Sequence, residues 1–222
     1  MARIIVAGGS GVLGRAVVAA HIQRADRVAV IDLAASPDKT GLLTSFSGVD
    51  LTDEAAVAAA YRSAIDELGG LDGVANVAGG FVWEQIADGA VDTWDRMYRM
   101  NVRTALVSSR AALGYLTAGG SIVNVGAAAA LAPVAGVGAY AGSKLGVTAL
   151  TESLADEVRS RGIRVNAVLP TILDTPTNRQ EMPGVDPEGW VKPTAAADVI
   201  AFLLSPASRA VTGAKIKLSA AG

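Results

Sequence analysis

Short apolar runs alternate with longer amphipathic stretches almost to the end of the chain. Most of the runs lack polar alternation, which is typical of strands in a parallel sheet covered by helices on both faces. They predict strands at Arg3–Ala7, Arg27–Ile31, Ser45–Val49, Gly73–Asn76, Ser121–Val125, Arg164–Leu169 and Lys215–Leu218. The longer stretches predict helices near Leu13–Ala25, Asp53–Leu68, Val91–Leu116, Ala139–Arg161 and Ala195–Leu204. This order predicts a doubly wound α/β sheet in a single domain over residues 1–222.

Local signals mark where the helices begin and end. Asp53 and Thr194 stand where helix N-caps are expected, because short polar side chains accept hydrogen bonds from the first free amides. Gly162 stands where a helix ends in a left-handed residue. The longest irregular stretch, Pro170–Pro193, is interrupted by further prolines. Because long loops in compact domains are usually functional, we predict a substrate loop there.

Composition predicts an aliphatic core and excludes several functions. Hydrophobic residues make up 51% of the 222 residues and aromatic residues 5%. The 19 Lys and Arg against 21 Asp and Glu leave a net charge of −2, so nucleic acid is not expected as a partner. The absence of cysteine excludes thiol catalysis, and the single histidine excludes multi-histidine metal sites. We expect no metal, and we place His21 on the surface of the first helix.

Two apolar segments bear on export and membranes. The run Ile4–Ala7 is too short for the core of a signal peptide, so we expect a cytoplasmic protein. Residues Ala111–Ser143 carry no charge, but glycines and Pro133 interrupt them. We therefore expect a buried strand and a loop of small residues there, with no membrane span.

A glycine-rich turn follows the first predicted strand, as Gly8-Gly9-Ser10-Gly11-Val12-Leu13-Gly14. Glycines allow a tight turn and let the backbone approach a pyrophosphate, which the amides of the following helix then bind. The alternative is a plain βα turn. The dinucleotide interpretation assigns cofactor binding to Gly8, Ser10, Gly11, Val12, Leu13 and Gly14.

Asp32 ends the second predicted strand, 24 residues after Gly8. A carboxylate there accepts hydrogen bonds from the adenosine-ribose hydroxyls and repels a 2′-phosphate. No Lys or Arg follows it directly, so NADH is predicted in preference to NADPH. An ordinary residue at a strand end is the alternative. Turns after the third and fourth strands add further candidates for the same edge of the sheet, namely Asp50, Leu51, Asn76, Ala78 and Gly79.

Tyr140 and Lys144 lie four residues apart in a predicted helix, so their side chains share one face. A free phenol has a pKa of about 10, too high for ready proton exchange at neutral pH. A neighbouring ammonium favours the phenolate and is expected to lower that pKa. The pair therefore predicts an acid–base site, in which Lys144 could also hold a ribose, although chance Tyr and Lys pairs on helices are common.

Taken together, these motifs resemble those of the short-chain dehydrogenase/reductases over nearly the whole chain. The matching elements are the Gly8–Gly14 loop, Asp32, Asn76-Val77-Ala78-Gly79, Asn101, Tyr140 with Lys144, and Val165–Pro170. The resemblance implies a seven-stranded sheet of order 3-2-1-4-5-6-7 and hydride transfer with Tyr140 as proton donor or acceptor. It also implies that Asn101 holds the water of a proton relay, and that Pro170 and Thr175 contact the nicotinamide.

The chain departs from the family's pattern at two points. The glycine spacing differs, with Gly11 at the fourth position and Val12 at the fifth. The usual catalytic serine, 13 residues before the tyrosine, is Ala127, and no hydroxyl residue lies between Asn124 and Tyr140. Losing one such donor costs on the order of 100-fold or more in rate on an unactivated carbonyl. An activated substrate or lost activity would explain the alanine.

Alanine at that position is similar to the quinonoid dihydropteridine reductases, a branch of the same family. Their glycine loop, Ala-Gly-Gly-aromatic turn and substrate loop resemble Gly8–Gly14, Ala78–Phe81 and Leu173–Arg179. A quinonoid dihydropterin gains aromatic stabilisation on reduction, so it needs little electrophilic help. The expected substrate-side residues are Phe81, Trp83, Ala127, Asn178, Arg179 and Trp190. The aromatic residues among them could stack on a flat heterocycle or pin a loop by burial, and Arg179 could be a solvated charge.

The leading hypothesis is therefore an NADH-dependent reductase of a small molecule, with quinonoid dihydropteridine as the substrate. One alternative is a general carbonyl reductase or alcohol dehydrogenase lacking the usual serine, and another is a non-catalytic NAD(H)-binding sensor. The family resemblance also implies a homodimer or homotetramer formed by the helices near Val91–Leu116 and Ala139–Arg161. Small residues on these helices would permit close packing, namely Ala105, Ala111, Ala112, Gly146, Ala149 and Ser153.

Overall fold

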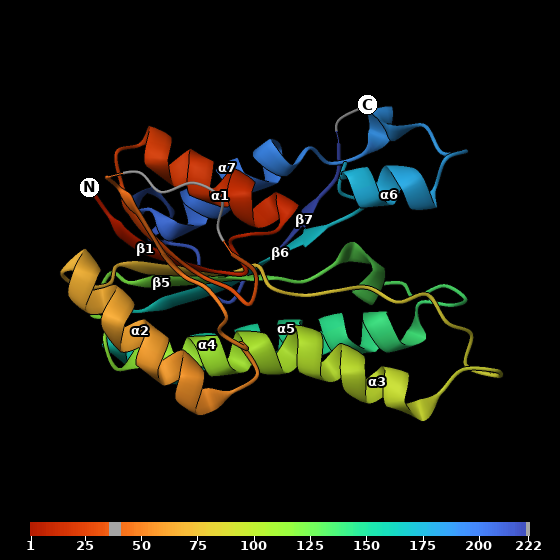
Figure 1. Ribbon diagram of the computed structural model, residues 1–222, viewed down its shortest axis with the longest axis horizontal. Coiled ribbons are helices and arrows are strands. Elements are labelled where there is room, and N and C mark those ends of the chain that lie inside the picture. Colours follow the sequence, from red (N-terminus) through yellow and green to blue (C-terminus); the bar gives the residue numbers. More distant parts are fainter. Residues whose placement is uncertain (36–40, 221–222) are drawn as a thin grey trace.

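The computed structural model describes residues 1–35 and 41–220, and its centre is one parallel sheet (Figure 1). Seven strands pair in the order β3-β2-β1-β4-β5-β6-β7, which confirms the predicted fold class. The strands are β1 Arg3–Ala7, β2 Arg27–Ile31, β3 Leu43–Phe46, β4 Gly73–Asn76, β5 Ser121–Val125, β6 Arg164–Pro170 and β7 Lys215–Leu218. Strands β2 and β3 lie on one side of β1, and β4 to β7 lie on the other. An open α/β sheet forms a crevice at its carboxyl edge where the strand order reverses in this way, here between β1 and β4.

Helices cover both faces of the sheet (Figure 1). One layer holds α2, α3, α4 and α5, and the opposite layer holds α1 and α7, with α6 beyond them. Their bounds are α1 Val12–Gln23, α2 Glu54–Leu68, α3 Val91–Met97, α4 Thr104–Leu113, α5 Gly138–Glu157, α6 Pro176–Glu181 and α7 Pro193–Leu204. None of the helices in the described ranges is both long and apolar enough to cross a membrane.

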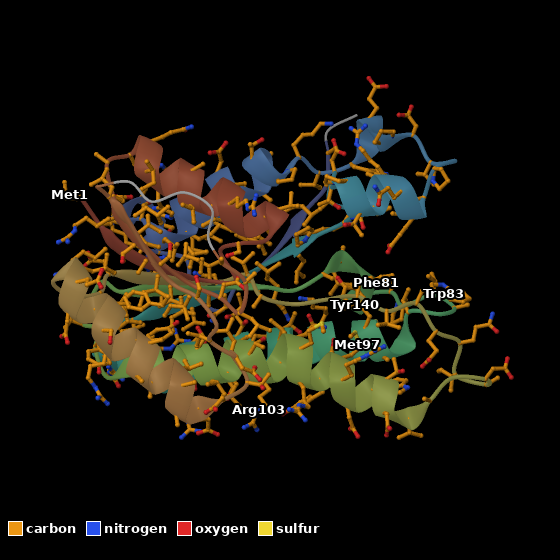
Figure 2. All side chains as sticks on the ribbon, viewed as in Figure 1. Met1, Phe81, Trp83, Met97, Arg103 and Tyr140 are labelled. Carbon is orange, nitrogen blue, oxygen red and sulfur yellow. The ribbon has the colours of Figure 1, made fainter. Side chains whose placement is uncertain are left out.

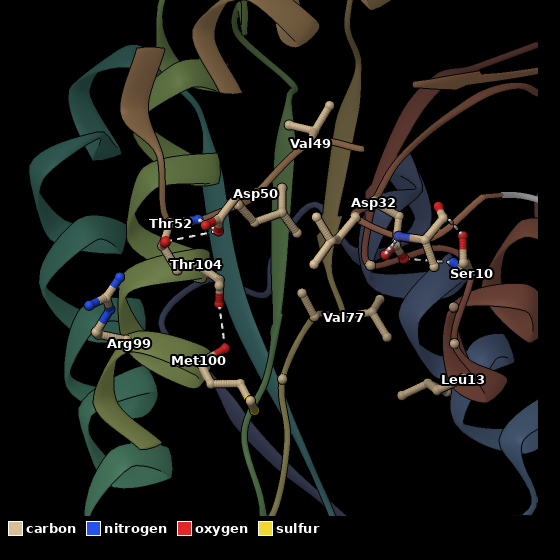
Figure 3. Close-up of a pocket in the computed structure, with 18 of the residues that line it drawn as sticks. Ser10, Leu13, Asp32, Val49, Asp50, Thr52, Val77, Arg99, Met100 and Thr104 are labelled. Atoms are coloured by element: carbon tan, nitrogen blue, oxygen red, sulfur yellow. Dashed lines mark hydrogen bonds between the residues drawn. The ribbon is translucent and has the colours of Figure 1, made fainter. Parts of the chain in front are cut away.

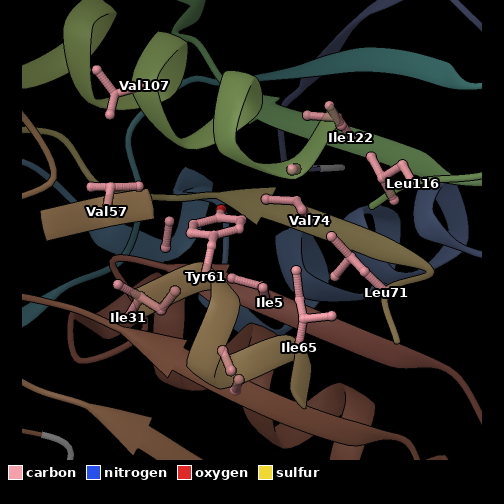
Figure 4. Close-up of a cluster of buried hydrophobic side chains, with 14 of the residues drawn as sticks. Ile5, Ile31, Val57, Tyr61, Ile65, Leu71, Val74, Val107, Leu116 and Ile122 are labelled. Carbon is pink, nitrogen blue, oxygen red and sulfur yellow. The ribbon is translucent and has the colours of Figure 1, made fainter. Parts of the chain in front are cut away.

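Each layer buries its own cluster of aliphatic side chains against the sheet. Figure 4 shows the cluster between the sheet and α2, where Tyr61 is fully buried among Ile5, Val74 and Ile122. The phenol of Tyr61 exchanges a hydrogen bond of 2.5 Å with Ser108 on α4, so the one polar atom of this ring is satisfied. These two layers hold the strand ends rigid beneath the crevice.

The structure shifts several predicted boundaries. Strand β3 starts at Leu43, because its pairing with β2 begins at Val28 and Leu43, and it ends at Phe46 before the predicted Ser45–Val49 is complete. Asp53 caps α2 as predicted, accepting hydrogen bonds from the amides of Ala55 and Ala56. The prediction of Thr194 as a cap is wrong, because Lys192 is the N-cap of α7 and Pro193 takes the first helical position.

The long helix predicted over Val91–Leu116 is interrupted. A π-helical segment, Tyr98–Arg103, separates α3 from α4, and such insertions are frequent at functional sites. Gly162 adopts the expected left-handed conformation, with φ of 68°, although it ends a short 3₁₀ turn after α5. Pro170–Pro193 is not wholly irregular, because it contains α6 and a 3₁₀ turn at Pro187–Gly189.

The prediction of a surface position for His21 is wrong. The side chain is buried, and its Nδ1 lies 2.9 Å from Oδ2 of Asp26. Burial lowers the pKa of His21, since desolvation outweighs the attraction of Asp26. The neutral imidazole therefore serves as a core group that ties the end of α1 to the chain entering β2.

Candidate active site

A cavity of about 1020 Å³ opens at the carboxyl ends of β1, β2 and β4 (Figure 3). Ser10, Leu13 and Asp32 line one side, and Arg99 and Met100 lie on the opposite side. The predicted cofactor residues among its lining are Gly8, Ser10, Gly11, Val12, Leu13, Gly14, Asp32, Asp50, Leu51, Ala78, Gly79 and Thr175. Segments far apart in the sequence thus meet around one volume, as the motif order predicts.

The glycine loop needs its glycines for close approach. Gly8 has a φ of +87°, and a Cβ there would clash with the backbone of Ala78. A Cβ on Gly14 would clash with the carbonyl of Gly8, so any larger residue at position 14 would push helix α1 away from the turn. The nearest atom to a Cβ on Gly11 would be 3.8 Å away, so that glycine borders open space.

The first turn of α1 is suited to an anion. Gly11 is its N-cap and supplies no side-chain cap, and no acidic residue stands in the first turn. The first amides of a helix have no acceptor within it, and together with the helix dipole they attract phosphate groups. Because Gly11, Val12 and Leu13 line the cavity, the loop fits the pyrophosphate of a dinucleotide.

Asp32 directly follows β2 and contacts the glycine loop across the edge of the sheet. Its Oδ2 accepts a hydrogen bond of 2.9 Å from the amide of Ser10, and its Oδ1 accepts one of 3.0 Å from Ala34. The guanidinium of Arg15 donates to the Ser10 carbonyl at 2.8 Å, which the sequence motifs did not suggest. Asp32 thus anchors the turn and presents a carboxylate to the cavity.

We expect the replacement of Asp32 by Ser to raise the affinity for NADPH relative to NADH by about 10- to 100-fold, because a carboxylate close to a 2′-phosphate repels it. Dissociation constants from the fluorescence of the bound nicotinamide measure this without a substrate. Asp50→Asn is the matched control, since it removes a charge from another wall of the cavity. An unchanged ratio in Asp32→Ser would contradict the role of this carboxylate.

The residues of the neighbouring turns differ in their orientation. Asp50 accepts hydrogen bonds of 2.8 Å from both the amide and the hydroxyl of Thr52, and the bond to the amide is the main reason why its pKa is lowered. Asn76 does not line the cavity; its side chain donates to Asn124 at 2.8 Å and to Ser109 at 2.9 Å inside the fold. Asn76 therefore holds β4 against β5, and Ala78 and Gly79 meet the cavity.

Tyr140 and Lys144 lie on one face of α5, behind the cavity wall. A Cβ on Gly79 would be 2.5 Å from Oδ1 of Asn101 and 3.1 Å from the Lys144 ammonium, so only glycine lets these side chains pack against the cavity wall. The ammonium lies 6.0 Å from the centre of the Tyr140 ring and donates to the carbonyl of Val125 at 2.9 Å. Pro170 ends β6 and is buried outside the cavity lining.

The expected lowering of the tyrosine pKa is wrong for this arrangement. Burial raises the pKa of Tyr140 to about 12, and burial lowers the pKa of Lys144 to about 8. The ammonium is directed to the Val125 carbonyl, so desolvation dominates at the phenol. At neutral pH the phenol keeps its proton, and the lysine is mostly charged.

Asn101 sits in the π-helical segment and clamps the turn after β4. Its Oδ1 accepts from the amide of Gly80 at 3.0 Å, and its Nδ2 donates to the Gly80 carbonyl at 3.1 Å. The same Nδ2 donates to the hydroxyl of Ser143 at 2.9 Å, and Ser143 donates to the Tyr140 carbonyl at 2.7 Å. Ser143 was missed from the sequence, although its place beside Lys144 was a usable signal.

The substrate side of the pair is apolar. Phe81 packs edge-on against Tyr140, with ring centroids 4.9 Å apart (Figure 2). Trp83 lies farther out, against the bare backbone of Gly136, and it is 58% exposed. Ala127 is buried at the end of β5 and, being alanine, has no hydroxyl to offer. Phe81 and Trp83 could contact a ligand.

The remaining residues of the substrate loop are occupied by contacts within the loop. Asn178 donates to the Leu173 carbonyl at 2.7 Å, and Arg179 binds Asp174 through two nitrogens at 2.5 and 2.9 Å. Thr175 caps α6. Trp190 is only 4% exposed, so it anchors the loop by burial and does not offer a face for stacking.

Further residues line the cavity that the motifs did not identify. They come from α3, the π-helical segment, the start of α4 and the substrate loop, namely Asp92, Asp95, Arg96, Arg99, Met100, Thr104 and Thr177. Those on α3 and the π-helical segment recur at intervals of three and four residues, the spacing of one helix face. That spacing was the available signal, but no motif drew attention to it.

Of the small residues predicted to form a dimer interface, Ala105, Ala112 and Gly146 pack within the monomer, whereas Ala149 and Ser153 are exposed on α5. Ala105 and Ala112 are buried within the subunit, and a Cβ on Gly146 would lie 2.9 Å from Val102. The helices therefore pack closely inside the chain at these positions. Their outward surface instead carries large apolar side chains, among them Trp94, which is 42% exposed.

Comparisons with known proteins agree with this geometry. The family model described as Enoyl-(Acyl carrier protein) reductase matches residues 11–220. The 2-(S)-hydroxypropyl-CoM dehydrogenase 3 of Xanthobacter autotrophicus is 31% identical over 235 residues, covering 95% of this chain and 92% of the relative. The protein named inactive 2-(S)-hydroxypropyl-CoM dehydrogenase 2 of the same organism is 36% identical over 182 residues, covering 75% of this chain and 79% of its own.

A structural neighbour extends the match to the whole fold. The short-chain dehydrogenase/reductase from Serratia marcescens superimposes with a TM-score of 0.87 at 29% identity, covering 97% of this chain and 95% of that one. Such relatives imply a nicotinamide cofactor, NAD or NADP, for which the cavity and the glycine loop described above are suited. The chain is an oxidoreductase that belongs to the short-chain dehydrogenase/reductase family.

Proposed function

We propose that the chain is an NADH-dependent reductase in which Tyr140 donates a proton to the substrate. The observation that carries the proposal is the position of Lys144 directly behind Gly79, which lines a cavity with a dinucleotide loop, with the Tyr140 ring next to Lys144 and Phe81. The nicotinamide, when bound, supplies the hydride. Asp32 favours the ribose hydroxyls of NADH, and the first amides of α1 bind the pyrophosphate.

The ionisation of the pair supports reduction. With the pKa of Tyr140 raised to about 12, the phenol holds its proton at neutral pH, so the protonated form that a reduction consumes is the one present. Lys144, with a pKa of about 8, is mostly protonated there and favours the phenolate that remains after the transfer. Asn101 holds the turn that carries Phe81 against Tyr140, so the donor keeps its position.

We propose an activated acceptor, and quinonoid dihydropteridine as the substrate. Ala127 leaves the site without the hydroxyl that would polarise an ordinary carbonyl. A quinonoid ring needs no such donor, because its reduction restores aromaticity. Phe81 and Trp83 supply exposed aromatic surface beside Tyr140 for a flat ring.

A second candidate is an alcohol dehydrogenase or carbonyl reductase, which the name of the 2-(S)-hydroxypropyl-CoM dehydrogenase favours. A third is an NAD(H)-binding protein without turnover, because one relative is named inactive. Consumption of NADH with quinonoid dihydropteridine generated in situ separates them, after the non-enzymatic rate is subtracted. Turnover well above that background supports the reductase, and turnover on simple alcohols or ketones alone supports the second candidate. Tight binding of NADH without any turnover supports the third.

The replacement of Ala127 by Ser should raise kcat/KM on a simple aromatic ketone by about 10- to 100-fold, since it restores one donor to the substrate oxygen. Ala129→Ser adds the same hydroxyl two residues further along, in a short 3₁₀ turn, and should change nothing. Steady-state oxidation of NADH measures both. Equal rates for Ala127→Ser and the unaltered chain would show that the missing serine does not set the selectivity.

We also propose a homodimer or homotetramer. The outward side of α3, the π-helical segment and α5 carries exposed large apolar side chains, and Trp94, Tyr98 and Leu145 are 42%, 52% and 54% exposed. Covering such side chains favours association. The mass in solution tests this proposal.

A further inference from the structure

The loops after β4, β5 and β6 meet at the carboxyl edge of the sheet, where Phe81 contacts Tyr140, and few cations stand in them. The loop after β4, residues 77–90, holds two carboxylates, Glu84 and Asp88, and no Lys or Arg. The loop after β5, residues 126–137, holds no charged residue. The substrate loop, residues 170–193, holds four carboxylates and two cations, a net charge of −2.

Both cations of the substrate loop share one carboxylate. Arg179 reaches Asp174 with Nε at 2.5 Å from Oδ1, and Lys192 reaches it with Nζ at 2.6 Å from Oδ2. The side chain of Asp174 is 9% exposed, whereas those of its two partners are 53% and 55% exposed. Both cations are therefore paired with a carboxylate of their own loop.

The backbone holds this cluster in place. The amide of Asp174 donates to the Val191 carbonyl at 2.9 Å, and the amide of Val191 donates to the Ile172 carbonyl at 2.8 Å. Leu173 and Val191 form a parallel bridge, so the two ends of the loop are joined at its base. If either Arg179 or Lys192 moved away, the largely buried carboxylate of Asp174 would lose one of its two cationic partners.

The surface that remains is apolar. Phe81 and Trp83 are 49% and 58% exposed in the loop after β4, and Leu131 and Val134 are 57% and 70% exposed in the loop after β5. Exposed apolar groups gathered at a cleft mark a binding surface for an apolar ligand. Figure 2 shows Phe81 beside Tyr140 with Trp83 beyond it, so the aromatic surface leads outward from the phenol.

We infer that this site selects a flat substrate without negative charge and excludes anions through Asp174, which occupies both cations of the substrate loop. The inference rests on the proposed function and narrows its substrate class. Arg96 and Arg99 do not alter it, because they line the cavity beside Asp92 and Asp95, and the charge of Arg99 acts on Asp50 on the cofactor side.

The test is the binding of two matched ketones, acetophenone and 4-acetylbenzoate, to the full chain saturated with NAD⁺. Ketone and NAD⁺ cannot react with each other, so calorimetry reports binding without turnover. In 10 mM salt we expect the carboxylate to bind about 10-fold or more weakly, since repulsion is little screened there. In 0.5 M salt the gap should shrink severalfold, whereas the affinity for acetophenone should stay constant.

The replacement of Asp174 by Asn should free Arg179 and Lys192 and tighten the binding of 4-acetylbenzoate about fivefold or more relative to acetophenone. Glu181→Gln is the matched control, because Glu181 is exposed on α6 and the change removes a loop charge without releasing a cation. The salt dependence of the unaltered chain stands as an independent measurement should Asp174→Asn loosen the loop.

Equal binding of the two ketones by the unaltered chain, or tighter binding of the carboxylate, would overturn the inference. Failure of NAD⁺ itself to bind would instead refute the proposed function. The two failures are thus distinguishable.

Discussion

Replacing Tyr140 by Phe should lower kcat by about 10²- to 10⁴-fold, the usual contribution of a positioned proton donor. Among the described residues, nothing forms a hydrogen bond with this hydroxyl, so removing it breaks no contact of the fold. The ring that packs on Phe81 is retained in Phe. We therefore expect the affinity for NADH and the melting temperature to change little, which isolates the loss to the proton transfer.

The matched control for this variant is Tyr115→Phe, because Tyr115 is 41% exposed near the end of α4 and away from the cavity lining. Stopped-flow oxidation of NADH separates hydride transfer from cofactor release. If Tyr140→Phe kept its activity on quinonoid dihydropteridine, proton donation by Tyr140 would be excluded, and water would have to supply the proton. The family and the fold would be unaffected.

Replacing Gly8 by Ala should destabilise the fold by about 2–5 kcal/mol. A left-handed φ costs a residue with a Cβ about 1–2 kcal/mol, and forcing a methyl group into a filled space costs about 1–3 kcal/mol. Both apply at Gly8, where φ is +87° and the added carbon meets the backbone of Ala78, which cannot move aside like a flexible side chain. At about 2–4 °C per kcal/mol, the melting temperature should fall by roughly 4–20 °C.

Gly11→Ala is the control from the same loop, since φ there is −73° and the nearest atom would be 3.8 Å away. Its stability should change by less than about 1 kcal/mol. Thermal unfolding followed by circular dichroism compares the two variants. Equal melting temperatures would show that the turn relaxes around Gly8 and that the close approach to Ala78 is not required.

The fold could be predicted from local sequence, because the signals of strands, helices and turns recur along the whole chain. Buried strands of a parallel sheet are continuous apolar runs, and the glycine turn, Asp32 and the Tyr140–Lys144 pair each depend on residues close in sequence. Such short-range signals place β1, β2 and β4 and the residues at their ends. They also place Asp53 as a cap, because capping depends on only the next three residues.

What sequence could not supply depended on neighbours from other elements. His21 is buried beside Asp26, and Asn101 of the π-helical segment binds Gly80 in the turn after β4, so both positions depend on contacts outside their own helix. The hydrophobic periodicity of a single helix reveals neither the burial of His21 nor the contact of Asn101 with Gly80.

The sequence by itself therefore determined the sheet, the glycine-rich turn and the pairing of Tyr140 with Lys144 on one helix face, because each depends on residues close together in the chain. Only the tertiary structure decided the charge state and direction of those groups. It buries Tyr140 and Lys144, turns the lysine toward Val125, and gathers Arg179 and Lys192 onto Asp174 from positions up to 18 residues apart. Desolvation and charge pairing depend on which side chains come together in space, and the order of residues does not state that.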